Sequence, residues 1–247
     1  ALLIPATPGT EIRGLGEMYP LNGPSWSLFF EYIGNILYAL FIRKFSTAML
    51  ALLVVVAGCA LAVFSIFGPY GDICAGFSLT GIEFTGGFFR LLYSFSAGLL
   101  LFRMFKPTHI KGAFWICSLA VIVLLAVPRL GGAGHLWMNG LYDTICFALL
   151  FPLIVYLGAS GKITDRYTKR VCKFLGDISY PLYMVHYPFI YLYYAWVKNE
   201  ELTFGESLYG ALAVVIGSML LAYICLKLYD ESVRKYLAGW FLKARNR

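Results

Sequence analysis

The chain has 247 residues, of which 60% are hydrophobic and only 13% are charged, and its mean hydropathy is +0.74. A water-soluble domain carries about 25% charged residues, so the composition excludes a water-soluble domain. It indicates a single all-α, polytopic membrane domain. The net charge of +7 would suit a nucleic-acid-binding protein, but the positions of the charges favour membrane orientation and no nucleic-acid partner.

The first 27 residues are expected to precede the first complete membrane span. Ala1-Leu-Leu-Ile4 reads as the end of an earlier helix, and no signal peptide is recognisable. Residues 5–27 hold several prolines and the run Asn22-Gly-Pro-Ser25, so they cannot continue that helix. We therefore expect an extramembrane connection here and further helices upstream of Ala1.

From this point the apolar runs predict about seven membrane helices. Their expected ranges are 26–42, 48–67, 88–105, 113–128, 139–158, 176–197 and 208–229. The six cysteines form no C-x-x-C pair, and four of them lie inside apolar runs. They are interpreted as small packing residues, so neither a disulfide nor a metal site is expected.

The connecting loops alternate in charge. Sixteen of the twenty basic residues lie on one expected side, in the loops near residues 43–44, 103–111 and 162–173 and in the C-terminal segment. The other side keeps only Arg13, Arg90, Arg129 and Lys198. The positive-inside rule therefore predicts a cytoplasmic C-terminus in a multi-pass inner or plasma membrane protein. The Lys162–Lys173 run is expected to face anionic lipid, with a phosphorylated ligand as the alternative.

The first predicted span carries a polar face. Ser27, Glu31, Asn35 and Tyr38 fall on it through steps of three and four residues. A carboxylate below the membrane surface is costly unless it is paired or hydrated.

The third predicted span offers Glu31 a partner. Arg90 lies at its outer end, and the small residues Ser94 and Gly98 follow at steps of four, which permits close helix approach. Glu31 and Arg90 are expected at similar depth. They form either a functional pair or a structural ion pair that joins two helices.

The sixth predicted span is the most unusual part of the sequence. Its helical spacing places Tyr183, His186, Tyr187, Ile190 and Tyr194 on one face, suited to a polar interior. The opposite face, Leu182, Val185, Phe189, Leu192 and Trp196, suits lipid.

A proline lies close to the histidine of this span. Pro188 has no amide hydrogen, so the carbonyl of Met184 loses its helical partner. His186 is either a functional group or a packed histidine bonded to a neighbouring carbonyl. Asp143, near the outer end of the fifth span, is expected to pair or cap, whereas His109 and His135 are expected to be solvated.

Several of these stretches together resemble the acyltransferase 3 family of sugar and cell-envelope O-acyltransferases. Residues 24–31 are similar to its Trp-Ser-Leu-x-x-Glu motif, and residues 179–188 to its Ser-Tyr-x-x-Tyr-x-x-His-x-Pro motif. Arg90 with Phe95 and Gly98 fits its arginine-bearing helix, and Glu231-Ser-Val-Arg234 is a shorter echo of its Glu-x-Pro-x-Arg. The family has about ten spans and an upstream Arg–His pair whose histidine is the expected base. This chain lacks that pair, which implies that about three N-terminal helices are missing.

The resemblance implies an acyltransferase for groups other than aminoacyl groups, which moves an acyl group, typically acetyl, from cytoplasmic acyl-CoA to a hydroxyl of a sugar or envelope glycan. It implies catalytic roles for Glu31, Arg90 and His186, with acyl-CoA as co-substrate and no bound cofactor or metal. Trp26, Ser27, Tyr183 and Tyr187 are the implied substrate-binding residues. The alternatives are a carrier of a small polar solute, or a helical bundle without chemistry.

The charge pattern generates a test of topology. In a protein whose own six cysteines are replaced, a single cysteine at position 168 of the 159–175 segment is expected to resist a membrane-impermeant maleimide in intact cells. A single cysteine in residues 5–27 or in the 198–207 loop is expected to react. The physical reason is the concentration of basic residues on the retained, cytoplasmic side. Labelling of the 159–175 cysteine from outside the cell would overturn the topology.

Overall fold

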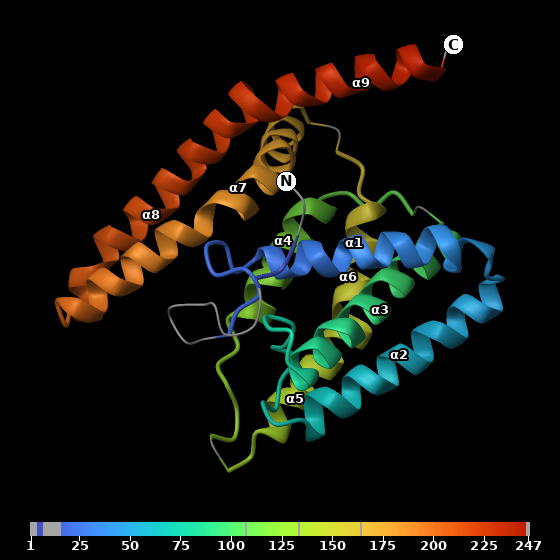
Figure 1. The fold of residues 1–247 in the computed structure, drawn as a ribbon, viewed down its shortest axis with the longest axis horizontal. Coiled ribbons are helices and arrows are strands. Elements are labelled where there is room, and N and C mark those ends of the chain that lie inside the picture. Colours follow the sequence, from blue (N-terminus) through green and yellow to red (C-terminus); the bar gives the residue numbers. More distant parts are fainter. Residues whose placement is uncertain (1–3, 7–15, 107, 133, 164, 246–247) are drawn as a thin grey trace. The chain divides into compact units, whose positions relative to one another are not determined.

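The computed structural model describes residues 4–6, 16–106, 108–132, 134–163 and 165–245; residues 1–3, which include most of the predicted helix end, lie outside this range. Its helices (Figure 1) are α1 (Ser25–Leu40), α2 (Thr47–Phe67), α3 (Gly81–Met104), α4 (Ala113–Leu125), α5 (Trp137–Ile145), α6 (Phe151–Ala159), α7 (Arg166–Asn199), α8 (Phe204–Cys225) and α9 (Glu231–Arg245). A 3-10 turn (Ile42–Lys44) follows α1, and π-helical turns, Cys146–Leu150 and Leu226–Asp230, join α5 to α6 and α8 to α9. The described residues contain no β-strand, so the predicted all-α class is confirmed.

Helix occupies every predicted span. Within the described part of the chain, four helical segments are long and apolar enough to cross a membrane, namely Thr47–Phe67, Gly81–Met104, Trp137–Ala159 and Phe204–Trp240, and Ala113–Leu125 is a shorter apolar helix. α1 has only 16 residues, and the many tyrosines of α7 lower its hydropathy. Membrane crossing by α1 and α7 therefore stays a prediction.

The chain divides into two compact units. The first comprises residues Ala1–Tyr19 and Trp26–Thr164, and so contains α2 to α6 and nearly all of α1. The second comprises Pro20–Ser25 and Asp165–Arg247, with α7 to α9. Residues 20–25, which lead into α1, thus belong to the same unit as α7.

In the first unit, α2 packs against both α3 and α5. Ala57 and Leu61 of α2 form a buried cluster with Tyr93 of α3 and Phe147 of the π turn, where the two aromatic rings meet edge to face at 4.9 Å. In water, burial of each such side chain stabilises the folded state by roughly 1.5–3 kcal/mol. In a bilayer the stabilisation comes instead from close packing between the helices.

The π turn between α5 and α6 has a local cause. Pro152 cannot donate a backbone hydrogen bond one turn back, and the amide of Phe151 bonds to the carbonyl of Cys146, five residues earlier. The carbonyl of Phe147 accepts a hydrogen bond from the Tyr93 hydroxyl at 3.0 Å. A backbone carbonyl at this irregular turn is thereby paired with a side chain of a neighbouring helix.

α1 and α3 approach each other through glycines other than the predicted one. A Cβ on Gly34 would lie 2.8 Å from Leu91, and one on Gly87 would lie 2.6 Å from Phe30. A Cβ on Gly98 would meet nothing within 4 Å. The expectation that Gly98 permits the close approach is therefore wrong, because α1 meets α3 nearer the N-terminal end of α3.

In the second unit, α7 and α8 pack side by side (Figure 1). The ring of Trp196 lies 2.5 Å from where a Cβ on Gly210 would be, and Phe189 lies 3.6 Å from the same point at Gly217. The face of α7 that was expected to meet lipid therefore contacts α8 at these two residues. Glycines on α8 make room for the aromatic rings, a pattern that α7 alone does not reveal.

The opposite face of α7 holds the 20–25 segment. The Asn22 side-chain amide donates to the Met184 carbonyl at 3.0 Å, the acceptor that Pro188 leaves without a helical partner. The Tyr183 hydroxyl donates to the carbonyl of Pro24 at 2.7 Å, and the Tyr187 ring packs against Gly23. The proline thus creates the attachment point for this segment.

A double-mutant cycle tests the hydrogen bond between the Asn22 side chain and the Met184 carbonyl. Asn22→Ala is expected to lower the free energy of unfolding by about 1 kcal/mol, because the Met184 carbonyl loses its donor. In a Pro188→Ala background the amide of residue 188 can supply that bond, so the same change should cost less than about half as much. Equilibrium unfolding in mixed micelles measures both.

Asn35→Ala is the matched control, since the Asn35 side chain bonds to a carbonyl of its own regular helix. Its cost is expected to be the same in the unchanged protein and in the Pro188→Ala background. An equal cost for Asn22→Ala in the two backgrounds would contradict the proposed rescue of the carbonyl.

Candidate functional site

A pocket of about 360 Å³ lies between α1 and α3 and is called here the Glu31 pocket. Four of the predicted site residues line it together: Trp26, Ser27 and Glu31 from α1, and Arg90 from α3. Its other lining residues are Phe30, Gly87, Leu91, Ser94 and Phe95. The polar face of α1 and the arginine of α3 therefore face one common space in the first unit.

Arg90 is held in a fixed orientation. Its guanidinium carbon lies 4.5 Å from the centroid of the Trp26 ring, and its Nη1 donates to the carbonyl of Ala75 at 2.8 Å. The Trp26 ring contacts Phe77 edge to face at 5.2 Å. Cation–π contact with Trp is worth about 0.5–2 kcal/mol. The guanidinium of Arg90 therefore lies over the Trp26 ring, and a substrate-binding role of Trp26 stays a prediction.

Glu31 is accessible from the pocket. The residue is exposed, and its backbone carbonyl accepts a hydrogen bond from the Asn35 side chain at 2.9 Å, within α1. A carboxylate and a guanidinium that line the same pocket can bind polar groups of a substrate or orient a neighbouring base.

A second cavity, of about 450 Å³, also has Arg90 in its lining and is called here the Asp143 cavity. Four charged residues line it: Asp72, Arg90, Arg129 and Asp143. Arg129 Nη1 and Asp72 Oδ2 form an ion pair at 3.0 Å, and Asp143 Oδ2 accepts the amide of Ile73 at 3.2 Å. Arg90 is thus common to both spaces.

The sequence did not single out this cavity. Asp143 was expected to pair or cap, and it does bond to a backbone amide, but of a loop seventy residues away. Asp72 and Arg129 were recognised only as charges on the outer side. Their common position on that side was the one available signal, because side-chain periodicity carries no information on which loops meet.

The remaining predicted residues lie together on α7 in the second unit. His186 Nδ1 lies 3.0 Å from the carbonyl of Leu182 and 2.9 Å from that of Tyr183. Since a carbonyl only accepts, Nδ1 carries a proton and neutral His186 has its lone pair on Nε2. The Tyr187 hydroxyl bonds to that of Tyr191 at 3.0 Å. The polar residues of the sequence also predict that Glu31, Arg90 and the His186 face line one cavity open towards the outer leaflet, and this stays a prediction.

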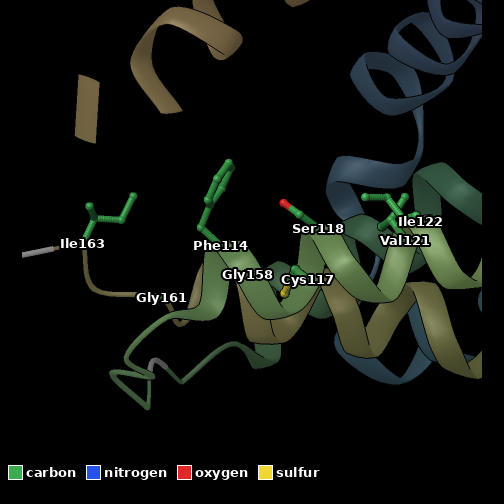
Figure 2. A pocket seen from close by; sticks show the side chains of 8 residues that line it. All are labelled: Phe114, Cys117, Ser118, Val121, Ile122, Gly158, Gly161 and Ile163. Carbon is green, nitrogen blue, oxygen red and sulfur yellow. The ribbon is translucent and has the colours of Figure 1, made fainter. Parts of the chain in front are cut away.

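A third pocket, of about 490 Å³, is apolar (Figure 2). Phe114, Cys117, Ser118 and Ile122 of α4 contribute to its lining. The Cys117 thiol donates to the carbonyl of Ile154 at 3.5 Å, so it serves helix packing. None of the residues that line this pocket is charged, so it offers neither charge stabilisation nor a strong base.

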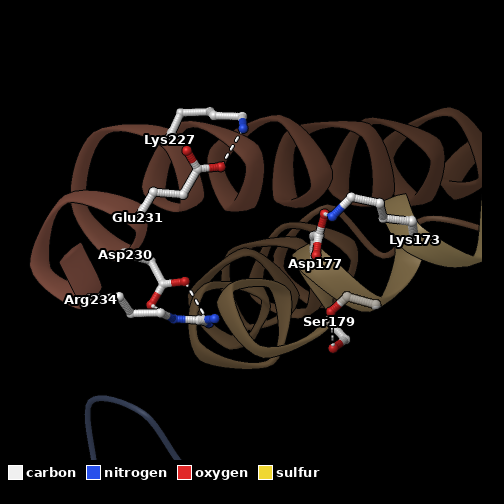
Figure 3. A network of polar contacts seen from close by, with 8 residues as sticks. Lys173, Asp177, Ser179, Lys227, Asp230, Glu231 and Arg234 are labelled. Atoms are coloured by element: carbon white, nitrogen blue, oxygen red, sulfur yellow. Dashed lines mark hydrogen bonds and ion pairs between the residues drawn. The ribbon is translucent and has the colours of Figure 1, made fainter. Parts of the chain in front are cut away.

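The C-terminal motif residues make local ion pairs (Figure 3). Glu231 pairs with Lys227, and Arg234 pairs with Asp230 at 2.7 Å, each one turn away. Lys173 and Asp177 form a similar pair on α7 at 2.9 Å. Exposed i,i+4 pairs contribute only about 0.3–0.5 kcal/mol, so these contacts support the helices locally. Within the described residues, no group of His, Cys, Asp and Glu could hold a metal ion.

One comparison with known proteins identifies the family of this chain. The family model described as an acyltransferase domain, that of the acyltransferase 3 family, matches residues 3–227. No curated protein and no solved structure matches the chain. Since the match covers nearly the whole chain, the protein belongs to the acyltransferase 3 family of membrane acyltransferases.

Proposed function

We propose that this acyltransferase moves an acyl group, acetyl in the simplest case, from cytoplasmic acyl-CoA to a hydroxyl group of a sugar or envelope glycan. The observation that carries the proposal is that Trp26, Ser27, Glu31 and Arg90 line one pocket. These are the residues that match the family's motifs on the first and third spans.

The reaction needs a base and a site for negative charge. The acceptor oxygen attacks the thioester carbonyl carbon, a C–O bond forms, the C–S bond breaks, and CoA leaves as the thiol once it has taken up a proton. The acceptor hydroxyl loses its proton to a base, because its own pKa lies far above neutral. Negative charge develops on the thioester oxygen and requires a preorganised cation or hydrogen-bond donor.

In this proposal Arg90 stabilises the developing negative charge, and Trp26 keeps its guanidinium in place. Glu31 orients the base or accepts a hydrogen bond from the substrate. The resemblance assigns the principal base to a histidine upstream of Ala1. His186, with its Nε2 lone pair, is an auxiliary polar group.

Glu31→Gln tests the chemical role of the carboxylate. The substitution keeps the shape of the side chain and removes its charge, so the rate of transfer from labelled acetyl-CoA should fall by about 10²-fold. Yield and monodispersity of the purified protein should remain unchanged. Glu200→Gln, in the exposed loop after α7, is the matched control and should retain full activity.

Loss of folded protein in Glu31→Gln, rather than loss of turnover, would show that the carboxylate has a structural role. Full activity of the folded variant would remove Glu31 from the reaction altogether.

Residues 1–247 alone are expected not to transfer acyl groups, whereas a version with its upstream helices restored should. The reason is that the resemblance implies a base outside these residues, and further helices that would cover their polar faces. Label transfer from acetyl-CoA to an added glycan compares the two. Turnover by residues 1–247 alone would make His186 the leading base, and His186→Ala should then abolish it.

A further inference from the structure

Three segments of the first unit supply most of the lining of the Asp143 cavity, and Arg90, Cys146 and Phe151 complete it. The loop from Asp72 to Phe77 forms one wall, residues 124–129 form another, and α5 contributes Asn139, Tyr142 and Asp143. Its volume of about 450 Å³ lies within the range of small-molecule sites, about 300–1,000 Å³. It is therefore large enough for one or two rings of a ligand.

The walls of this cavity are fixed by hydrogen bonds. Glu83 Oε2 accepts the amides of Gly76 at 2.9 Å and Phe77 at 3.3 Å. The Asn139 side chain bonds to both the amide and the carbonyl of Leu130, at 2.7 and 3.1 Å. Loops held in this way keep the cavity open before a ligand arrives, which lowers the entropy lost on binding.

The charges in the lining cancel. Asp72 and Asp143 bring two negative charges, and Arg90 and Arg129 bring two positive ones. The Asp72 side chain is only 14% exposed and is already paired with Arg129. An anionic ligand would meet two carboxylates, and a cationic ligand two guanidinium groups. The lining therefore favours a neutral ligand with many hydrogen-bonding groups.

One carboxylate oxygen is available to such a ligand. Asp143 Oδ2 accepts the Ile73 amide, and among the described residues no hydrogen bond reaches Oδ1. A ligand hydroxyl can donate to this oxygen, and charge-assisted bonds of this type are about twice as strong as neutral ones. Phe77 and Tyr142 add aromatic rings for apolar C–H faces. Hydroxyl edges with apolar faces are the chemistry of a sugar ring.

We propose that the Asp143 cavity is the acceptor subsite and binds a neutral sugar unit, with Asp143 as the residue that accepts a hydrogen bond from its hydroxyl group. This inference rests on the proposed function. Arg90 lines both the Asp143 cavity and the Glu31 pocket, so a sugar bound here has the cation of the reaction site as its neighbour. The predicted topology places the loops around this cavity on the outer side, where envelope glycans are found.

Cys74 gives a binding readout that does not depend on turnover. It lines the cavity and is exposed, whereas Cys59, the other exposed cysteine, lies in α2 and can be replaced by alanine. Partial desolvation and the nearby Asp72 raise the pKa of the Cys74 thiol, so labelling with a membrane-impermeant maleimide is done at about pH 8.5, where more of the reactive thiolate is present.

The experiment uses the full-length Cys59→Ala protein in detergent. Methyl glucoside and methyl N-acetylglucosaminide are expected to slow modification of Cys74, and methyl glucuronide, the anionic counterpart, to slow it less. Asp143→Asn keeps an acceptor for the Ile73 amide but loses its charge, so the protecting concentration and the acceptor KM should both rise about tenfold, with kcat changed much less. Asp177→Asn, exposed on α7, is the matched control and should change neither.

The outcomes separate this inference from the proposed function. Acyl transfer that saturates with a glycan while Cys74 stays unprotected places the acceptor elsewhere and overturns the subsite, though the function stands. Protection without acyl transfer supports the subsite and contradicts the function. Better protection by methyl glucuronide than by methyl glucoside overturns the neutral ligand class. If Asp143→Asn does not fold, protection of Cys74 by the three methyl glycosides in the protein that keeps Asp143 still tests the subsite.

Discussion

Arg90 is a cation on an apolar helix, and the first unit is arranged around its need for partners. A guanidinium in such a place is costly unless its charge and donors are satisfied. It obtains a π face from Trp26 on α1 and a carbonyl from Ala75 in the loop before α3. Glu83 in turn holds the amides of that loop. One side chain therefore joins two helices and a loop, and the two candidate sites share it as a wall.

Two prolines show how backbone constraints produce long-range contacts in this fold. Pro152 accompanies a π turn whose Phe147 carbonyl receives the Tyr93 hydroxyl, and Pro188 leaves a carbonyl that receives the Asn22 amide. In an apolar environment an unpaired carbonyl costs several kcal/mol, so each interruption must find a donor. The position of a proline thus selects which distant segment packs beside it.

The sequence predicted the features that depend on local physics. Helices followed from apolar runs, and the unpaired carbonyl beside Pro188 followed from the covalent structure of proline. Features that depend on which elements meet did not follow. Gly98 has the spacing of a packing residue, yet Gly34 and Gly87 fill that role, because the contact point depends on the crossing of two helices. The bond from Ile73 to Asp143 joins a loop to a helix with no shared pattern.

The electrostatic demand of acyl transfer explains why a restrained arginine suits the proposed site. A thioester is neutral, and its carbonyl oxygen gains negative charge only as the acceptor attacks. A cation that had to move towards this oxygen would lose part of its stabilising energy to reorganisation. Arg90 is already fixed against Trp26 and Ala75, so it can respond to the new charge without moving. The same restraint makes the planar guanidinium hard to replace, since a lysine at this position would keep the charge but lose the planar group that stacks on the indole ring.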